Sequence, residues 1–160
     1  MTDELGTLHG EGDGRAIHFE RLYHATLDEL WRALTDPASL AGWLAPVRRF
    51  ELETGGRVHI DFGDGEEMHG VMRELEPYRV VEYTWDWESV VRFELEPRDD
   101  GVLLLLDHSA LPTEQAPSHG AGWHAHLDLL EAHLRGESIQ FAPRYEALLP
   151  MYQREVATLP

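Results

Sequence analysis

The sequence from residue 81 to residue 106 reads VEYTWDWESVVRFELEPRDDGVLLLL. In its first part apolar and polar residues alternate, which is typical of a β-strand with one buried face. The alternation resumes after Glu88 and continues to Leu95, and the Asp-Asp-Gly turn at 99–101 comes before a continuous apolar run. This stretch predicts three antiparallel strands whose common apolar face is covered by another layer of structure.

The same two-residue period occurs in the N-terminal half of the chain. Residues 58–62 and 68–75 predict two strands, and glycine-containing turns at 55–56 and 63–65 bound the first of them. Residues 16–23 alternate in the same way and predict the first strand of the chain. Together these segments predict a sheet built mainly as an antiparallel meander.

Two short helices are predicted between the first strand and the meander. Leu30, Trp31 and Leu34 recur at helical spacing, and Asp28 is the candidate N-cap of the helix that carries them. Pro37 stops that helix and is suited to the first position of a second short helix.

A long amphipathic helix is predicted over residues 119–135. Its apolar stripe consists of Trp123, Leu127, Leu130 and Leu134. Residues 143–158 predict a last helix, in which Pro150 is a potential kink. A sheet with one apolar face and a helix with one apolar stripe bury each other, so the predicted fold class is α+β.

Leu103 and Leu105 break the alternation of the last strand, because they lie on the face opposite to Leu104 and Leu106. A strand that is apolar on both faces is normally buried on both. We therefore expect either the C-terminal stretch or the second subunit of a homodimer to cover the Leu103 and Leu105 face.

The composition limits the partners of the chain. With 30 acidic and 13 basic residues the net charge is −17, which repels phosphate backbones and anionic lipids, so neither nucleic acid nor a membrane is an expected partner. The 160 residues contain no cysteine, which excludes disulfides and thiolate chemistry. The acidic, glycine-rich start does not have the order of a signal peptide, so a cytoplasmic location is expected.

Several short motifs occur in an order that resembles a known family. They lie at 30–37, at Trp43 with Pro46, and at 55–57, 70–71, 74–77, 83–85, 108–112 and 120–123. In this order they resemble proteins similar to the activator of heat-shock protein 90 ATPase, a family of the START-like, or SRPBCC, superfamily. The resemblance implies a stand-alone bacterial member of that family.

The resemblance extends over about residues 16 to 136 and implies a helix-grip fold, in which a curved antiparallel sheet wraps the long C-terminal helix. With it we expect a disordered lead-in at 1–15, a helix-grip domain at 16–136, and a C-terminal helical extension at 137–160 that packs on the domain. The resemblance also implies a cavity between the sheet and the helix.

Large aromatic residues on the concave face of such a sheet are suited either to line a pocket or to fill the core. Histidines on the same face are candidate polar anchors, and His108 is in phase to meet His126 across the cavity. The candidate ligand-binding residues are Trp43, Phe62, Tyr83, Trp85, Trp87, Phe93, His108, Trp123, His126, Leu127 and Leu130.

No metal site, cofactor or catalytic residue is expected. The histidines at 119, 126 and 133 share a helix face, but two helical turns separate each from the next, which is too far for one ion. Asp107, His108 and Ser109 do not form a triad, because neighbours on a strand point to opposite faces.

Three functions are compatible with this sequence. The first is the binding of a small hydrophobic molecule, a lipid or an aromatic, polyketide-like compound, without covalent catalysis. The second is a chaperone-associated interaction module, as the family resemblance implies. The third is a cyclase or hydrolase that uses His108 or His126 as a general base beside Tyr83.

Overall fold

The computed structural model describes residues 4–11, 14–86 and 88–157 of the chain. The strands in chain order are β1 (Thr7–Glu11), β2 (Gly14–Tyr23), β3 (Val47–Phe50), β4 (Arg57–Gly63), β5 (Glu66–Glu76), β6 (Val80–Trp85), β7 (Ser89–Arg98) and β8 (Gly101–Pro112). The helices are α1 (Leu27–Thr35), α2 (Pro37–Trp43), α3 (Ala116–Leu134) and α4 (Phe141–Ala157), with a short 3-10 helix η1 (Thr113–Gln115) before α3.

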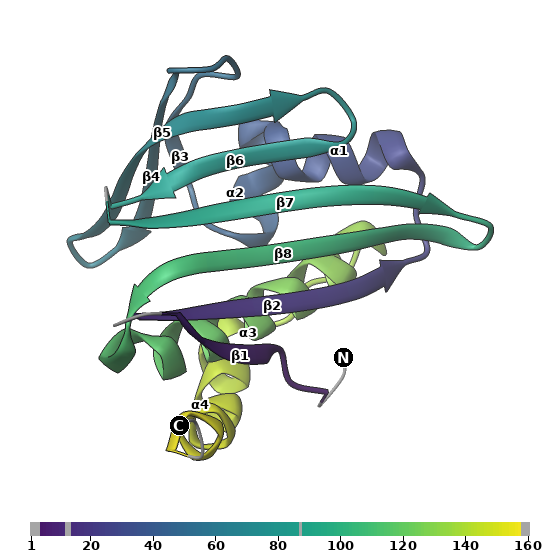
Figure 1. The fold of residues 1–160 in the computed structure, drawn as a ribbon. Helices are drawn as coiled ribbons and strands as arrows, with labels where there is room; N and C mark the ends of the chain where they lie inside the picture. Colours follow the sequence, from purple (N-terminus) through teal and green to yellow (C-terminus); the bar gives the residue numbers. More distant parts are fainter. Residues whose placement is uncertain (1–3, 12–13, 87, 158–160) are drawn as a thin grey trace.

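Within the described residues, all the strands form one antiparallel sheet in the order β1-β2-β8-β7-β6-β5-β4-β3 (Figure 1). The sheet curves, and the long helix α3 lies along one of its faces while α1 and α2 cover its other half (Figure 1). This is the helix-grip fold, as predicted. The core lies between the sheet and these helices.

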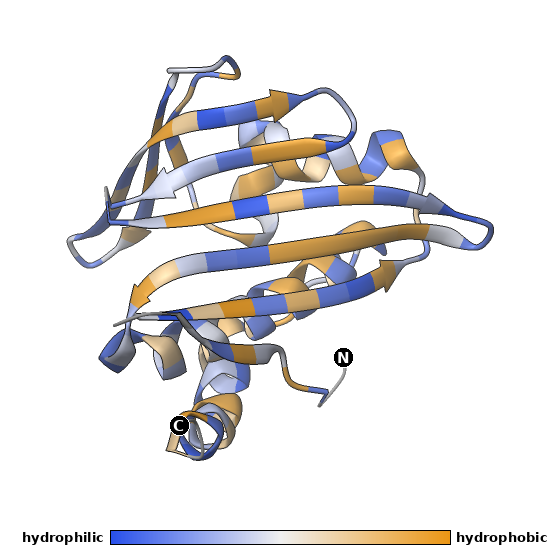
Figure 2. Cartoon of the chain, viewed as in Figure 1, coloured by the Kyte–Doolittle hydropathy of each residue, from blue (hydrophilic) through white to orange (hydrophobic). Residues whose placement is uncertain are grey.

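The alternation that predicted the sheet corresponds to its two faces. On β7 the side chains of Val91, Phe93 and Leu95 are buried, whereas those between them are only half-buried. The strands of Figure 2 accordingly alternate between hydrophobic and hydrophilic residues along much of their length.

Strand β8 is the exception, since it is hydrophobic over an unbroken stretch (Figure 2). Leu103 and Leu105 lie on its outer face and are half-buried, and their neighbour Leu22 on β2 is 42% exposed. The C-terminal stretch does not account for this face, because α4 packs along α3 instead. That part of the expectation is wrong, and a second subunit at the Leu103 and Leu105 face stays a prediction.

The first residues differ from the expected disordered lead-in, because residues 7–11 form strand β1. This strand pairs with β2 in antiparallel register, with Thr7 opposite His18 and Glu11 opposite Gly14. Its composition, with glycine and histidine between polar residues, gives no alternation to predict a strand. The backbone hydrogen bonds offered by the edge of β2 hold it there.

The entry of α1 also differs from the prediction. Its N-cap is Thr26, whose Oγ1 accepts a hydrogen bond from the Glu29 backbone N–H at 3.1 Å. Asp28 lies inside the first turn, where a carboxylate interacts favourably with the helix dipole. Pro37 is at the start of α2 as predicted, after the N-cap Asp36.

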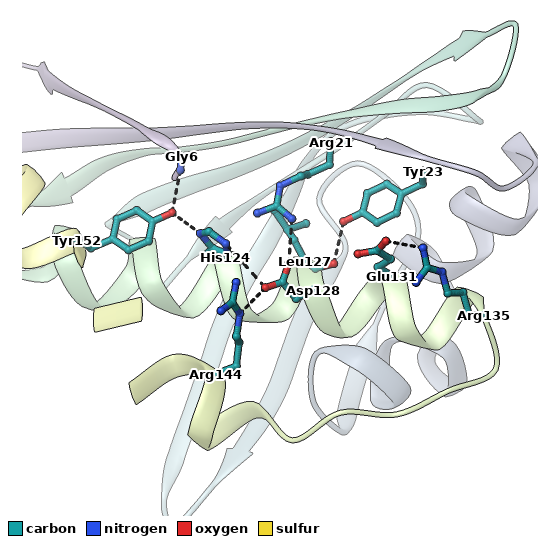
Figure 3. Close-up of polar contacts among 10 residues, drawn as sticks. All are labelled: Gly6, Arg21, Tyr23, His124, Leu127, Asp128, Glu131, Arg135, Arg144 and Tyr152. Carbon is teal, nitrogen blue, oxygen red and sulfur yellow. Dashed lines mark hydrogen bonds and ion pairs between the residues drawn. The ribbon is translucent and has the colours of Figure 1, made fainter. Parts of the chain in front are cut away.

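A buried ion cluster fixes α3 to its neighbours (Figure 3). Asp128 is fully buried, and it accepts hydrogen bonds from Arg21 Nη1 on β2 at 3.1 Å and from Arg144 Nε on α4 at 2.8 Å. Both arginine side chains are 13% exposed. The Asp128 carboxylate therefore connects strand β2 of the sheet with helices α3 and α4.

A second group of contacts continues this connection towards the N-terminus (Figure 3). The hydroxyl of Tyr152 on α4 accepts a hydrogen bond from the Gly6 N–H at 2.8 Å and lies 2.8 Å from His124 Nδ1 on α3. Gly120 permits this approach, because a Cβ there would come within 2.6 Å of the Tyr152 ring. These contacts hold α4 against α3, and the first residues of α4, Phe141 and Tyr145, reach the site described next.

Candidate functional site

A cavity of about 980 Å³ lies along helix α3, from Ser118 to Leu129. Its walls come from the end of α2 and the segment after it, the β4–β5 turn, the end of β6, and the facing sides of α3 and α4. The lining residues are Ala41, Gly42, Trp43, Leu44, Ala45, Pro46, Phe62, Gly65, Glu66, Glu67, Met68, Trp85, Asp86, Ser118, His119, Gly122, Trp123, His126, Leu129, Phe141 and Tyr145. The volume is that of a site for a drug-sized molecule.

Aromatic rings form much of this wall. The rings of Phe62 and Trp85 lie 5.7 Å apart, and those of Trp85 and Trp123 lie 5.3 Å apart in an edge-to-face arrangement. On α4, Phe141 stacks on Tyr145 at 5.5 Å. Such rings supply large apolar area in fixed orientations, which suits a flat apolar ligand.

His126 is a polar group in this apolar wall. Its Nδ1 lies 3.0 Å from the backbone carbonyl oxygen of Trp43, which only accepts hydrogen bonds, so Nδ1 carries the proton. Burial lowers the pKa of His126 to about 4, and the ring is therefore neutral near pH 7. Nε2 then has a free lone pair, and no hydrogen bond joins it to any of the described residues. The ring also stacks on Phe141 at 4.4 Å.

The neutral state of His126 gives a testable pH dependence. Its pKa is about 4 when folded and about 6.5 when unfolded, so between these values the unfolded chain binds more protons and stability falls as pH falls. On acidification from about pH 7 to about pH 4 the wild type should lose about 3 kcal/mol more than His126→Phe. Urea unfolding at both pH values measures this, and equal losses in the two proteins would contradict it.

His108 lies behind the aromatic wall of the cavity, and both of its ring nitrogens form hydrogen bonds. Trp123 Nε1 donates to His108 Nδ1 at 2.8 Å, so Nε2 carries the proton and donates to Ser89 Oγ at 2.8 Å. Ser89 Oγ in turn donates to the backbone oxygen of Trp85 at 3.1 Å. Burial, with His119 nearby, holds the pKa of His108 well below its ordinary value. With both nitrogens occupied, His108 is not placed to act as a general base.

The expected meeting of His108 and His126 is not found, because the Trp123 ring contacts both of them. Of the candidate ligand-binding residues, five line the cavity: Trp43, Phe62, Trp85, Trp123 and His126. Tyr83, Phe93, His108, Leu127 and Leu130 do not line it. Trp87 lies outside the described residues.

The candidate residues that do not line the cavity are buried because the middle of the sheet and helix α3 are in direct contact. Tyr83, Phe93, Leu127 and Leu130 are each at most 2% exposed and belong to the core. Phe93 packs edge-to-face on Trp123 at 5.7 Å, so the sheet and α3 are in direct contact there. The cavity therefore lies along the side of α3 that α2 and α4 share, and not between α3 and the middle of the sheet.

Several cavity residues are not among the sequence candidates. Phe141 and Tyr145 belong to α4, whose position along α3 no local pattern gives. Gly122 lines the cavity, and a Cβ built on it has no atom within 4 Å. A glycine in the interior of a helix lowers its stability, so its presence indicates a packing or functional reason at that position but not which one.

The comparisons with known proteins agree with this architecture. Residues 24–135 match the family model described as Activator of Hsp90 ATPase homolog 1-like protein. The chain belongs to this family. No curated protein sequence is significantly similar to the chain.

Several solved structures are similar to this chain. CalU16 from Micromonospora echinospora is 27% identical over 91% of this chain and 90% of its own, with a TM-score of 0.76. MLL2253 from Mesorhizobium loti is 28% identical over 78% of this chain and 100% of its own, with a TM-score of 0.70. EF2215 from Enterococcus faecalis, a conserved protein of unknown function, is 20% identical over 97% of this chain and 92% of its own, with a TM-score of 0.84.

In the part of the chain that the structure describes, no helix is long and apolar enough to cross a membrane.

Proposed function

We propose that the chain binds a small, flat, apolar molecule in the cavity between α2, the β4–β5 turn, α3 and α4. The observation that carries this proposal is a volume of about 980 Å³ walled by aromatic rings, beside a core that is otherwise tightly filled. Membership of a START-like family supports a ligand-binding role.

The charges at the cavity narrow the class of ligand. The charged residues among its lining are Glu66, Glu67 and Asp86, all acidic, and the chain as a whole carries a net charge of −17. An anion such as a fatty-acid carboxylate would be repelled there. A neutral polycyclic aromatic compound fits the rings of the wall, which favours the aromatic class over the acidic lipid class.

His126 adds a polar preference. Its Nε2 accepts hydrogen bonds, so a ligand with a hydroxyl donor should bind more tightly than its bare hydrocarbon. A single neutral hydrogen bond contributes about 0.5–1.5 kcal/mol, which corresponds to a ratio of affinities of roughly two- to thirteenfold.

The test compares phenanthrol, phenanthrene and palmitate by native mass spectrometry and thermal shift. At a ligand concentration 100 times the dissociation constant, phenanthrol should raise the melting temperature by roughly 5–10 °C. Phenanthrene should bind more weakly and palmitate least of all. In His126→Phe the preference for phenanthrol over phenanthrene should disappear. Binding of none of the three would refute the proposal, and binding of palmitate alone would refute the aromatic class.

Gly122 offers a way to close the cavity without damaging the fold. Leucine at this position extends into open space and improves helix propensity by about 0.8 kcal/mol. Gly122→Leu should therefore weaken phenanthrol binding at least about tenfold while the melting temperature stays equal or rises. Gly122→Ala, which adds one methyl group, is the matched control and should keep binding. Unchanged affinity in Gly122→Leu would place the ligand elsewhere.

A further inference from the structure

Outside the cavity, the outer face of the β4–β5 hairpin gathers two histidines and a carboxylate. His59 on β4 is directly opposite His69 on β5 in the antiparallel register. Their neighbours Val58, Ile60 and Met68 are buried, so the two imidazoles are on the face turned away from the core. The site candidates of the sequence do not include them.

The side chains of this group are already close together. The rings of His59 and His69 stack with centroids 4.1 Å apart, and His59 Nε2 is 2.8 Å from Glu67 Oε1. One ligand atom from each of the three residues lies within 4.8 Å of the other two. In a tetrahedral zinc site with bonds of about 2.1 Å, ligand atoms are about 3.4 Å apart, so small side-chain rotations would bring these three into range.

We propose that His59, Glu67 and His69 form a binding site for Zn²⁺. Two imidazole nitrogens and one carboxylate oxygen are a ligand set that this ion takes, with a water molecule in the fourth position. The paired strands hold the two histidines at a fixed spacing, which lowers the cost of ordering the site. The net charge of −17 also attracts a cation to this surface.

The surroundings of the group are compatible with a cation. Arg48, the nearby basic side chain, is paired with Asp61 at 2.8 Å, which compensates its charge. The backbone N–H of His69 donates to Asp86 Oδ1 at 3.1 Å, which anchors the β5 side of the group. Glu67 and Asp86 also belong to the lining of the cavity, so the ion would be held beside its rim.

Isothermal titration of the metal-free full chain with zinc chloride tests this site. The wild type should bind one equivalent, and His59→Gln and His69→Gln should each weaken that binding at least about tenfold. His24→Gln is the matched control, because His24 is an exposed histidine that faces only the backbone oxygen of Asp100. Circular dichroism should show all three variants folded.

Absence of zinc binding by the wild type would overturn the proposal. Equal affinity in His59→Gln, His69→Gln and the control would overturn it as well, because the ion would then bind elsewhere. Neither result depends on the aromatic ligand, since the titration contains only the protein and the metal.

Discussion

Replacement of Asp128 by alanine should lower the free energy of unfolding by about 3–5 kcal/mol. Asp128 is fully buried and accepts hydrogen bonds from Arg21 on β2 and Arg144 on α4. Without the carboxylate, two guanidinium groups that are each 13% exposed would be left close together, and the cost of keeping them out of water would have no compensation.

Equilibrium unfolding in urea measures this effect. Glu76→Ala is the control, since Glu76 forms an exposed ion pair with Arg79 on the surface, and it should cost less than about 1 kcal/mol. A loss in Asp128→Ala as small as that of Glu76→Ala would mean that the buried cluster does not hold α3 and α4 in place.

Replacement of Trp123 by alanine should lower stability by a similar amount, about 3–5 kcal/mol. The indole packs against Phe93 and Trp85, and its N–H donates to His108 Nδ1 at 2.8 Å. Truncation removes this packing, leaves a buried histidine nitrogen without its donor, and enlarges the cavity that Trp123 lines.

Trp123→Phe separates the two contributions. It keeps an aromatic ring in the wall but removes the donor, so it should cost about 1–3 kcal/mol, which is the usual cost of an unsatisfied buried group. Denaturant unfolding of both variants gives the two values. Equal losses in Trp123→Phe and Trp123→Ala would contradict a separate stabilising contribution from the ring that phenylalanine retains.

Much of the fold could be predicted because its signals are local. The alternation of Val91, Phe93 and Leu95 specifies a strand with one buried face, and the structure buries all three. The N-cap of α1 is Thr26 and not Asp28, so the predicted start of this helix was two residues late. Threonine and aspartate are both common N-cap residues, and the sequence alone does not choose between them. Strand β1 was missed because its pairing with β2, and not its own pattern, makes it a strand.

The site was less predictable because it depends on packing between distant segments. Trp43, Trp85 and Trp123 could be identified by their size and their faces, and all three line the cavity. Whether the space between the sheet and the helix is filled depends on how side chains such as Phe93 pack, which no periodicity specifies. Phe141 reaches the cavity only because α4 is held along α3.

The proposed zinc site could not be predicted from the spacing of histidines in the sequence. The sequence predicts no metal site, because the histidines that share a helix face are two turns apart. His59 and His69 lie on two neighbouring strands, and the register of β4 with β5 places them opposite each other. Knowledge of that register was needed before the pair could be considered as ligands.

Amide chemical shifts test most directly whether the cavity between α2, the β4–β5 turn, α3 and α4 binds an apolar aromatic ligand. The backbone amides of glycine residues are suitable probes, because some glycines line the cavity and others do not. Gly42, Gly65 and Gly122 line the cavity, whereas Gly10 on β1 and Gly101 on β8 do not.

In a two-dimensional nitrogen–proton spectrum titrated with phenanthrol, the amides of the lining glycines should shift in a saturable way while those of Gly10 and Gly101 stay in place. Saturable shifts at Gly10 and Gly101 without change at Gly42, Gly65 and Gly122 would contradict the account, as would a spectrum that phenanthrol leaves unchanged.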